Sequence, residues 1–292
     1  MNINSSHDGK RLCVSKADGS IDVFQDGKLA TTLTGHKGPV FDSVFIHPDL
    51  GSAIVSIGQD GRLIVWVEED PNHFRNAHSM VAPSSLLALS IAPKELGFRI
   101  AAACANGSVF FTTYNHGKLS HSSFHAHDGG CTSVTWCPHV PTTDSTRALL
   151  ATGGCDGNVK VWACTGSSGV SSAEDGAEEY SKPLICIKAH DWVSCVAWAP
   201  GITETPIRIA SCGREGKVFV HKAGDVAGKW ESLTIVESSD DVKPCWSVSW
   251  NMIGTVLAVG SGDSQISLYH ESGEGVWEEA KVEEREVTAA EE

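Results

Sequence analysis

Residues 35–66 read GHKGPVFDSVFIHPDLGSAIVSIGQDGRLIVW, and this stretch decides the fold. An Asp60-Gly61 pair separates two short apolar runs, AIVSI and RLIVW. An Asp-Gly pair between apolar runs is a strong signal for a tight β-hairpin, because strand side chains alternate between two faces. The stretch therefore predicts a hairpin, preceded by another short strand that ends at Phe45.

The same turn signal recurs along nearly the whole chain. Five steps cover the 245 residues between its first and last copies, a mean of 49 residues. The six turn pairs are Asp18-Gly19, Asp60-Gly61, Asn106-Gly107, Asp156-Gly157, Glu215-Gly216 and Asp263-Ser264. The third residue after the first member of each pair is apolar, namely Ile21, Leu63, Val109, Val159, Val218 and Ile266. Self-similarity at a fixed period predicts a repeat architecture built from β units.

A second signature lies upstream of four of these hairpins. The pairs Gly35-His36, Ala77-His78, Ala126-His127 and Ala189-His190 each precede a short strand, and those strands end at Phe45, Ile91, Trp136 and Trp198. The order of His, strand, turn, strand, Asp-Gly, strand and closing aromatic residue resembles the WD repeat, which supplies four strands to each blade of a β-propeller. The resemblance predicts an all-β fold, a six-bladed WD-repeat β-propeller over residues 1–282.

Within the WD-repeat family, a His, a Ser or Thr, the turn Asp and a Trp form a buried hydrogen-bonded set. The resemblance places two complete sets in this chain, His36, Ser56, Asp60 and Trp66 and then His127, Thr152, Asp156 and Trp162. The fifth repeat keeps its His and Ser but has Glu215 and His221 in place of Asp and Trp. A buried imidazole or carboxylate costs several kcal/mol unless it is hydrogen-bonded, so we expect these residues to be structural and not catalytic.

The two ends of the chain predict a ring that does not close on itself. The residues before Arg11 can supply only one short strand, which the first blade needs. The last blade is predicted to finish itself with a strand over residues 276–282. No strand then remains to close the ring, and an open β edge invites pairing with another chain.

Two segments depart from the repeats. Residues 165–181, TGSSGVSSAEDGAEEYS, are rich in Gly, Ser and acids and predict a mobile loop. Residues 283–292 are predicted to be an acidic disordered tail. Both are interpreted as solvated surface, with a regulatory or partner-contacting role as the alternative.

Composition excludes several classes of function. The chain has a net charge of -14, which repels phosphate backbones and anionic membranes, so direct nucleic-acid binding is not expected. No apolar run approaches the roughly 18 residues of a membrane helix, and residues 1–10 lack the apolar core of a signal peptide. The ten cysteines have no paired spacing, which favours reduced thiols in the cytosol or nucleus over disulfides.

Three longer stretches carry a closer resemblance: TLTGHKGPVF at 32–41, AHDWVSCVAWAP at 189–200 and CWSVSWNMIGTVLAVGSGDSQISLY at 245–269. They resemble the family of six-bladed WD-repeat subunits shared by the COPII outer coat and the Y-shaped complex of the nuclear pore, the Sec-thirteen (SEC13) family. That family usually begins with a longer first strand containing Ile-His-Asp, an element that this chain lacks.

The resemblance implies a structural scaffold without enzymatic activity, cofactor or metal. In the family, a long COPII outer-coat subunit or an α-solenoid nucleoporin donates a seventh blade between blades six and one. The expected contacts are Leu12, Val14, Ile21, Val23, Trp246, Val248, Trp250, Leu257 and Val259. The implied locations are the cytoplasm, endoplasmic reticulum (ER) exit sites, the cytoplasmic side of COPII vesicle membranes through partners, and the nuclear pore in the nuclear envelope.

Two other functions remain as alternatives. One is a peptide-recognising WD-repeat adaptor, although the acidic charge and the missing closing strand count against it. The other is the sister open propeller of the nuclear pore, Seh-one, which accepts a blade from a different partner. Standard catalytic motifs are absent from the sequence, and the spacing of His121, His125 and Cys131 fits no common zinc site.

Overall fold

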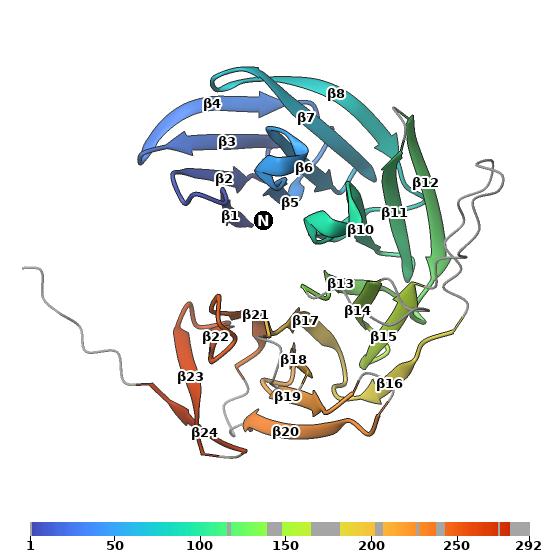
Figure 1. The fold of residues 1–292 in the computed structure, drawn as a ribbon, viewed down its shortest axis with the longest axis vertical. Helices are drawn as coiled ribbons and strands as arrows, with labels where there is room; N and C mark the ends of the chain where they lie inside the picture. Colours follow the sequence, from blue (N-terminus) through green and yellow to red (C-terminus); the bar gives the residue numbers. More distant parts are fainter. Residues whose placement is uncertain are drawn as a thin grey trace, which may run out of the picture.

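Six four-stranded antiparallel sheets form the fold, arranged as blades around a centre (Figure 1). The computed structural model describes residues 2–115, 118–138, 148–164, 182–201, 207–225, 228–237, 243–273 and 275–280. The first strand of each blade lies near the centre and the fourth at the outer rim. The prediction of a six-bladed all-β propeller is confirmed.

Blades one to three follow one another along the chain, each built from consecutive strands. Blade one consists of β1 (Ile3–Ser5), β2 (Arg11–Ser15), β3 (Ser20–Gln25) and β4 (Lys28–Thr34). Blade two consists of β5 (Val40–Phe45), β6 (Ala53–Gly58), β7 (Arg62–Asp70) and β8 (His73–Val81), with a short 3₁₀ helix, η1 (Pro48–Leu50), after β5. Blade three consists of β9 (Leu86–Ile91), η2 (Lys94–Leu96), β10 (Arg99–Cys104), β11 (Ser108–Asn115) and β12 (Lys118–His125).

Blades four to six repeat the same order. Blade four consists of β13 (Cys131–Trp136), β14 (Ala148–Gly154), β15 (Asn158–Cys164) and β16 (Ile185–Lys188). Blade five consists of β17 (Val193–Trp198), β18 (Ile207–Gly213), β19 (Val218–Ala223) and β20 (Glu231–Val236). Blade six consists of β21 (Cys245–Trp250), β22 (Val256–Ser261), β23 (Ile266–Gly273) and β24 (Val276–Glu279). The last blade therefore finishes with its own strand, as predicted.

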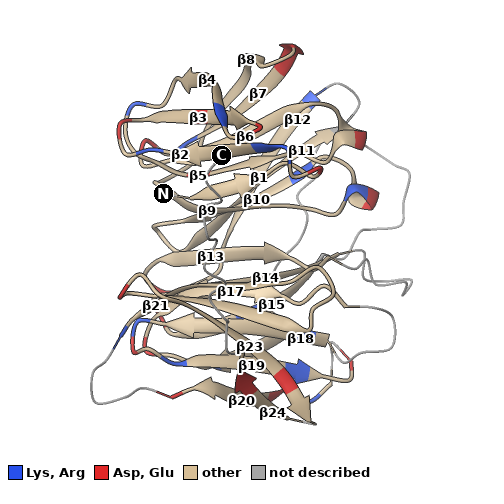
Figure 2. Ribbon diagram, turned by 90° about the vertical axis from the view of Figure 1, so that its left-hand side faces the viewer, with Lys and Arg blue, Asp and Glu red and all other residues tan. Residues whose placement is uncertain are grey.

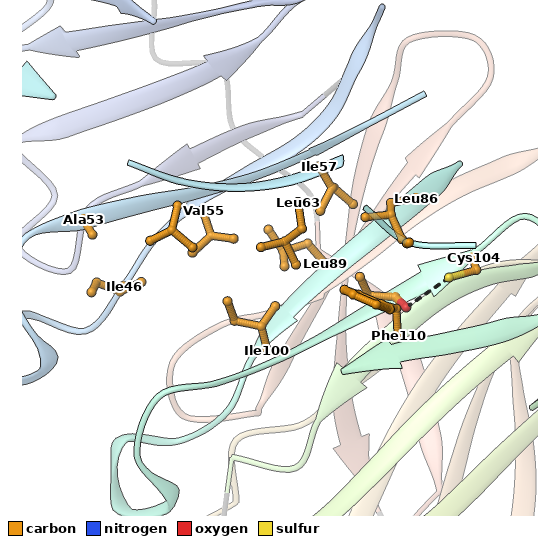
Figure 3. Close-up of a cluster of buried hydrophobic side chains, with 13 residues drawn as sticks. Ile46, Ala53, Val55, Ile57, Leu63, Leu86, Leu89, Ile100, Cys104 and Phe110 are labelled. Atoms are coloured by element: carbon orange, nitrogen blue, oxygen red, sulfur yellow. Dashed lines mark hydrogen bonds between the residues drawn. The ribbon is translucent and has the colours of Figure 1, made fainter. Parts of the chain in front are cut away.

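Apolar side chains hold each blade against the next. Figure 3 shows the cluster between blades two and three, in which Val55 and Leu63 point toward Leu86, Leu89 and Ile100. Four further buried clusters join blades one and two, three and four, four and five, and five and six. The pairing arises because the strands alternate, so that one face of a blade packs on its successor and the other on its predecessor.

One pair of the predicted repeat signature lies at a different place in the blades. Ala77-His78 does not immediately precede the first strand of blade three but lies within the outer strand β8 of blade two. The position four residues before Leu86, which corresponds to His36 before Val40, is Ala82. The spacing misled the sequence interpretation because β8 is longer than the outer strands of the other blades. The predicted loop at 165–181 and the tail at 283–292 lie outside the described residues.

The described residues contain no helix long and apolar enough to cross a membrane.

Replacing Gly107 by Ala should destabilise the chain by at least about 2 kcal/mol, against about 1 kcal/mol for Gly27→Ala. Both glycines have a positive φ, but a Cβ at Gly107 would overlap the carbonyl oxygen of His127, whereas no atom lies within 4 Å of one at Gly27. Urea unfolding of the two variants measures the difference. Equal losses would show that the turn backbone shifts without cost.

Candidate partner-binding gap

The faces of blades one and six that have no neighbouring blade among the described residues define the candidate site. Of the five buried apolar clusters found among the described residues, none joins blade six to blade one. Figure 1 shows the break in the ring between the strands of blade one and those of blade six. Figure 2 views the molecule from that side, and most charged residues there lie at turns and strand ends.

Blade six presents an apolar face that is covered in every other blade. Ile266, the third residue after the blade-six turn, is 74% exposed. The five residues at the same repeat position, Ile21, Leu63, Val109, Val159 and Val218, are each 0% exposed. Leu268 stands two residues further along β23, opposite Ala258 on β22, and both are half-buried. Ile266 and Leu268 therefore lie on the face that would contact a seventh blade.

Blade one presents the complementary face. Ile3 pairs with Val14 across β1 and β2, and Leu12 pairs with Phe24 across β2 and β3, so these four side chains share one face. Ile3 is 63% exposed and Leu12 is 40% exposed. Ile54, which occupies the position of Leu12 in blade two, is fully buried against blade one. The exposure of Leu12 therefore reflects the missing neighbour.

A polar group interrupts the apolar face of blade one. Asp22 pairs with Val14 across β2 and β3, and it therefore lies on the same face as Ile3. Lys16 Nζ lies 3.0 Å from Asp22 Oδ2, and Thr32 Oγ1 donates to Asp22 Oδ1 at 2.8 Å. The hydrogen bond to Asp22 raises the pKa of Lys16. A group that covers this face must accommodate one ion pair among aliphatic side chains.

Six of the nine predicted contact residues lie on the opposite faces. Ile21 and Val23 are fully buried in the cluster that joins blades one and two. Val248, Leu257 and Val259 are buried against blade five, and Trp250 packs on the same cluster while its Nε1 donates to the Ala197 carbonyl at 3.2 Å. Because successive side chains of a strand point to opposite faces, these six residues lie on the faces opposite to the open ones.

The other three predicted residues are accessible. Leu12 and Val14 lie on the open face of blade one. Trp246 is 52% exposed at the start of β21, but its ring lies near Arg214 of blade five. Sequence reasoning missed Ile3, Phe24, Ile266 and Leu268. The repeat position of Ile266 was recognised in the sequence, but alternation alone does not show which face of a blade packs on the following one.

One hydrogen-bonded set lies within blade two and the other lies within blade four. His36 Nδ1 lies 3.0 Å from Asp60 Oδ1 and its Nε2 lies 2.8 Å from Ser56 Oγ, which also accepts from Trp66 Nε1 at 2.9 Å. In blade four the matching distances are 2.9 Å for His127 to Asp156, 2.7 Å for His127 to Thr152 and 2.9 Å for Trp162 to Thr152. Ser56, Thr152 and both imidazoles are buried, so the sets offer no surface for chemistry.

Burial and hydrogen bonding determine the protonation states of His127 and Asp156 in the blade-four set. Burial lowers the pKa of His127 more than the Asp156 carboxylate raises it. Burial alone would raise the pKa of Asp156, but hydrogen bonds from Asn158 and His127 lower it to about 2. The set therefore holds a neutral imidazole and a carboxylate at neutral pH, an arrangement that anchors the turn.

Blade five builds a longer version of the set. His190 contacts Glu215 through Nδ1 and Ser211 through Nε2, at 2.9 Å for the Ser211 contact. Ser211 Oγ also lies 2.8 Å from His221 Nε2, and His221 Nδ1 lies 2.8 Å from Ser232 Oγ. Burial lowers the pKa of His190, and burial together with His190 lowers that of His221 to about 3. Glu, His and Ser resemble a catalytic triad in order, but Ser211 is fully buried and no substrate reaches it.

Metal-binding and thiol chemistry find little support in the described part of the chain. No group of three or more His, Cys, Asp or Glu side chains there is placed to hold a metal ion. The nine cysteines whose side chains the structure describes are free thiols. Burial raises the pKa of Cys13 and Cys104 to about 11, which keeps both protonated and poorly nucleophilic at neutral pH.

The repeated blades and their buried sets place the chain in the class of WD-repeat β-propellers, here with an unclosed ring. The family described as WD domain, G-beta repeat matches residues 117–163, within blades three and four.

Relatives across most of the chain specify the class further. The chain is 31% identical over 287 residues to "Protein SEC13 homolog" of Drosophila melanogaster, covering 92% of this chain and 76% of that protein. It is 31% identical over 312 residues to "Protein transport protein sec13" of Emericella nidulans, covering 95% and 96%. It is 32% identical over 289 residues to "Protein transport protein SEC13" of Yarrowia lipolytica, covering 94% and 92%. The chain belongs to the SEC13 family.

Proposed function

We propose that this chain is a non-enzymatic scaffold subunit of a COPII-type coat in ER-to-Golgi transport, and that it accepts a seventh blade from a partner protein. Relatives that match along most of the chain are named as protein transport proteins. The observation that carries the proposal is the exposure of Ile266, whose five repeat equivalents are fully buried by a following blade.

The physical driving force is burial of two facing apolar surfaces. A donated blade would cover Ile266 and Leu268 on one side and Ile3, Leu12 and Phe24 on the other. Burying apolar area contributes roughly 25 cal/mol per Å². Obligate interfaces of this kind cover more than about 2,000 Å², and their cores resemble a domain interior. We therefore expect the isolated chain to be less stable than its complex.

The proposed partners are large proteins that carry a spare blade. A long outer-coat subunit would place the chain in the cytoplasm, at ER exit sites and on the cytoplasmic side of vesicle membranes, with membrane contact supplied by the partner. The same gap suits an α-solenoid nucleoporin, which would place a second pool at the nuclear pore in the nuclear envelope. In both assemblies the residues 1–282 act as one propeller.

Affinity purification from the source cells at moderate salt tests the proposal. The native chain should retain one or two large solenoid-containing proteins in near-equal amounts. Leu12→Asp, combined with Ile266→Asp, should lose them, because two charges would be buried against the donated blade.

The matched control is Tyr114→Asp, which changes an exposed aromatic residue on blade three, away from the gap. It should retain the partners, and thermal melts should show all variants folded. Recovery of a lone monomer with small peptides would contradict the proposal and favour the peptide-recognising adaptor. Recovery of a different large subunit would favour the Seh-one type of scaffold.

A further inference from the structure

A second exposed surface lies at one end of the propeller, on blades five and six and outside the open faces of the gap. Arg214 makes cation–π contacts with two indole rings, with its Cζ 4.9 Å from the centre of the Trp192 ring and 5.9 Å from that of Trp246. Trp192 is 38% exposed and Trp246 is 52% exposed. We call Trp192, Arg214 and Trp246 the indole–arginine stack.

The backbone positions all three residues. Trp192 directly precedes β17, Arg214 lies in the turn between β18 and β19, and Trp246 is the second residue of β21. The Arg214 N–H donates to the Trp192 carbonyl at 3.3 Å, which ties the turn to the neighbouring loop. Cation–π contact with two rings further restricts the guanidinium plane. Little side-chain entropy is therefore left to lose when a ligand binds.

The N–H groups of the Arg214 guanidinium are available as hydrogen-bond donors. The Arg214 side chain makes no hydrogen bond or ion pair among the described residues, whereas Glu215, its neighbour in sequence, and Asp263, in the turn between β22 and β23, each have a partner. Glu215 contacts His190, and Asp263 accepts from Lys243 at 2.7 Å. Cation–π contact with the rings does not use the N–H groups of the guanidinium, which therefore stay available for an acceptor.

We propose that the indole–arginine stack binds an acidic segment of a partner protein. One carboxylate of that segment would accept two parallel N–H bonds from the edge of Arg214, and an adjacent apolar side chain would pack on the exposed indole surface. Arg–carboxylate pairs are often bidentate, and Trp and Arg are the residue types most enriched at interface hot spots. The guanidinium provides a local positive charge for a carboxylate, and this local attraction must exceed the repulsion from the chain's net charge of -14.

Fluorescence anisotropy with the full chain tests the proposal. The probe is the peptide EELEEFEE-amide with fluorescein attached to its N-terminal amine, and the matched peptide has Gln in place of every Glu. The native chain should bind the acidic probe at least about tenfold more tightly than the Gln peptide, since a charge-assisted pair contributes 1.5–3 kcal/mol.

Three variants localise the binding. Arg214→Gln should weaken probe binding by about tenfold or more. Arg214→Lys should weaken it by about threefold or more, because a Lys ammonium lacks the planar guanidinium that forms two parallel hydrogen bonds. Arg75→Gln is the matched control, since Arg75 is an exposed arginine on blade two that pairs with Glu69. It should leave binding unchanged. Thermal melts identical to that of the native chain would establish that the variants are folded.

Equal affinity for the acidic and Gln peptides, or equal binding by the native and Arg214→Gln chains, would overturn the proposal. A second result would also overturn it. If the native chain fails to bind the probe, and a full chain with Gln at Glu283, Glu284, Glu286, Glu291 and Glu292 binds it, the occupant is this chain's own acidic tail. If the proposal for the indole–arginine stack fails, the proposal for the partner-binding gap still stands, because neither Arg214 nor Trp192 lies on the open faces of the gap.

Discussion

Asp in place of Val218 should leave the isolated chain unfolded or destabilised by more than about 4 kcal/mol, whereas Asp in place of Ile266 should change its stability by less than about 1 kcal/mol. Both residues are the third after their blade's turn, so the substitutions are matched in chemistry and in strand position. Val218 is fully buried against blade six, and Ile266 is exposed because no described blade packs on its face.

Urea unfolding of the isolated chains measures this contrast. The denaturation slope should be unchanged in Ile266→Asp, which would show that the same surface is exposed on unfolding. A large loss of stability in Ile266→Asp would mean that this side chain is covered in solution, and the gap would then be closed by the chain itself.

Acidification from pH 6.5 to pH 5 should cost the isolated chain up to about 4 kcal/mol. The folded-state pKa values of His127, His190 and His221 are all depressed by burial, so below pH 6.5 the unfolded chain binds protons that the folded chain does not. Stability from these residues is present above the unfolded pKa and is lost as the pH falls. Each uncompensated proton costs about 1.4 kcal/mol per pH unit.

Asp42 opposes this loss. Burial raises its pKa to about 6, although Asn2 and Asn4 each donate to its Oδ1 at 3.0 Å. The folded chain therefore binds a proton at Asp42 at a higher pH than the unfolded chain, which offsets one of the three histidines. Carboxylates with lowered pKa values, such as Asp156, affect stability only below about pH 4.

The variant His221→Trp isolates one part of the acid effect. It replaces the blade-five imidazole by the indole that blades two and four carry at this position, and the indole N–H can donate to Ser211. The loss of stability between pH 7.5 and pH 5 should shrink by up to about 2 kcal/mol, whatever the packing cost of the larger ring. An unchanged loss would show that His221 takes up protons equally in the folded and the unfolded chain over this range, so that burial does not lower its pKa.

The repeat itself could be predicted from the sequence because each blade carries its own local signals. Asp60-Gly61 fixes a hairpin without reference to any distant residue, and the third-position apolar residue follows from alternation alone. The hydrogen-bonded partners of His36 and His127 were implied by the resemblance to the WD repeat, which assigns each role to a position within one repeat. These features depend on contacts inside one blade, which the order of residues specifies directly.

The faces of the gap could not be assigned in the same way. Alternation shows that the side chains of Leu12 and Val14 lie on one face of the strand and that the side chain of Cys13 lies on the opposite face. It does not show which of the two faces packs on blade two. Ile21 and Ile266 have the same repeat position and similar neighbours in sequence, yet one is fully buried and the other is exposed. Only the number and order of blades around the ring distinguish them, and that is a property of the tertiary fold.

Each blade of this propeller is made from an unbroken stretch of chain, including blade one, which receives β1 from the residues immediately before β2. During synthesis a blade can form as soon as its own four strands have left the ribosome, and the first blade need not wait for the last. Short-range pairing of this kind favours rapid folding and shortens the time during which strand edges are exposed. A partner's strands could likewise enter after synthesis without breaking any pairing that the chain has already made.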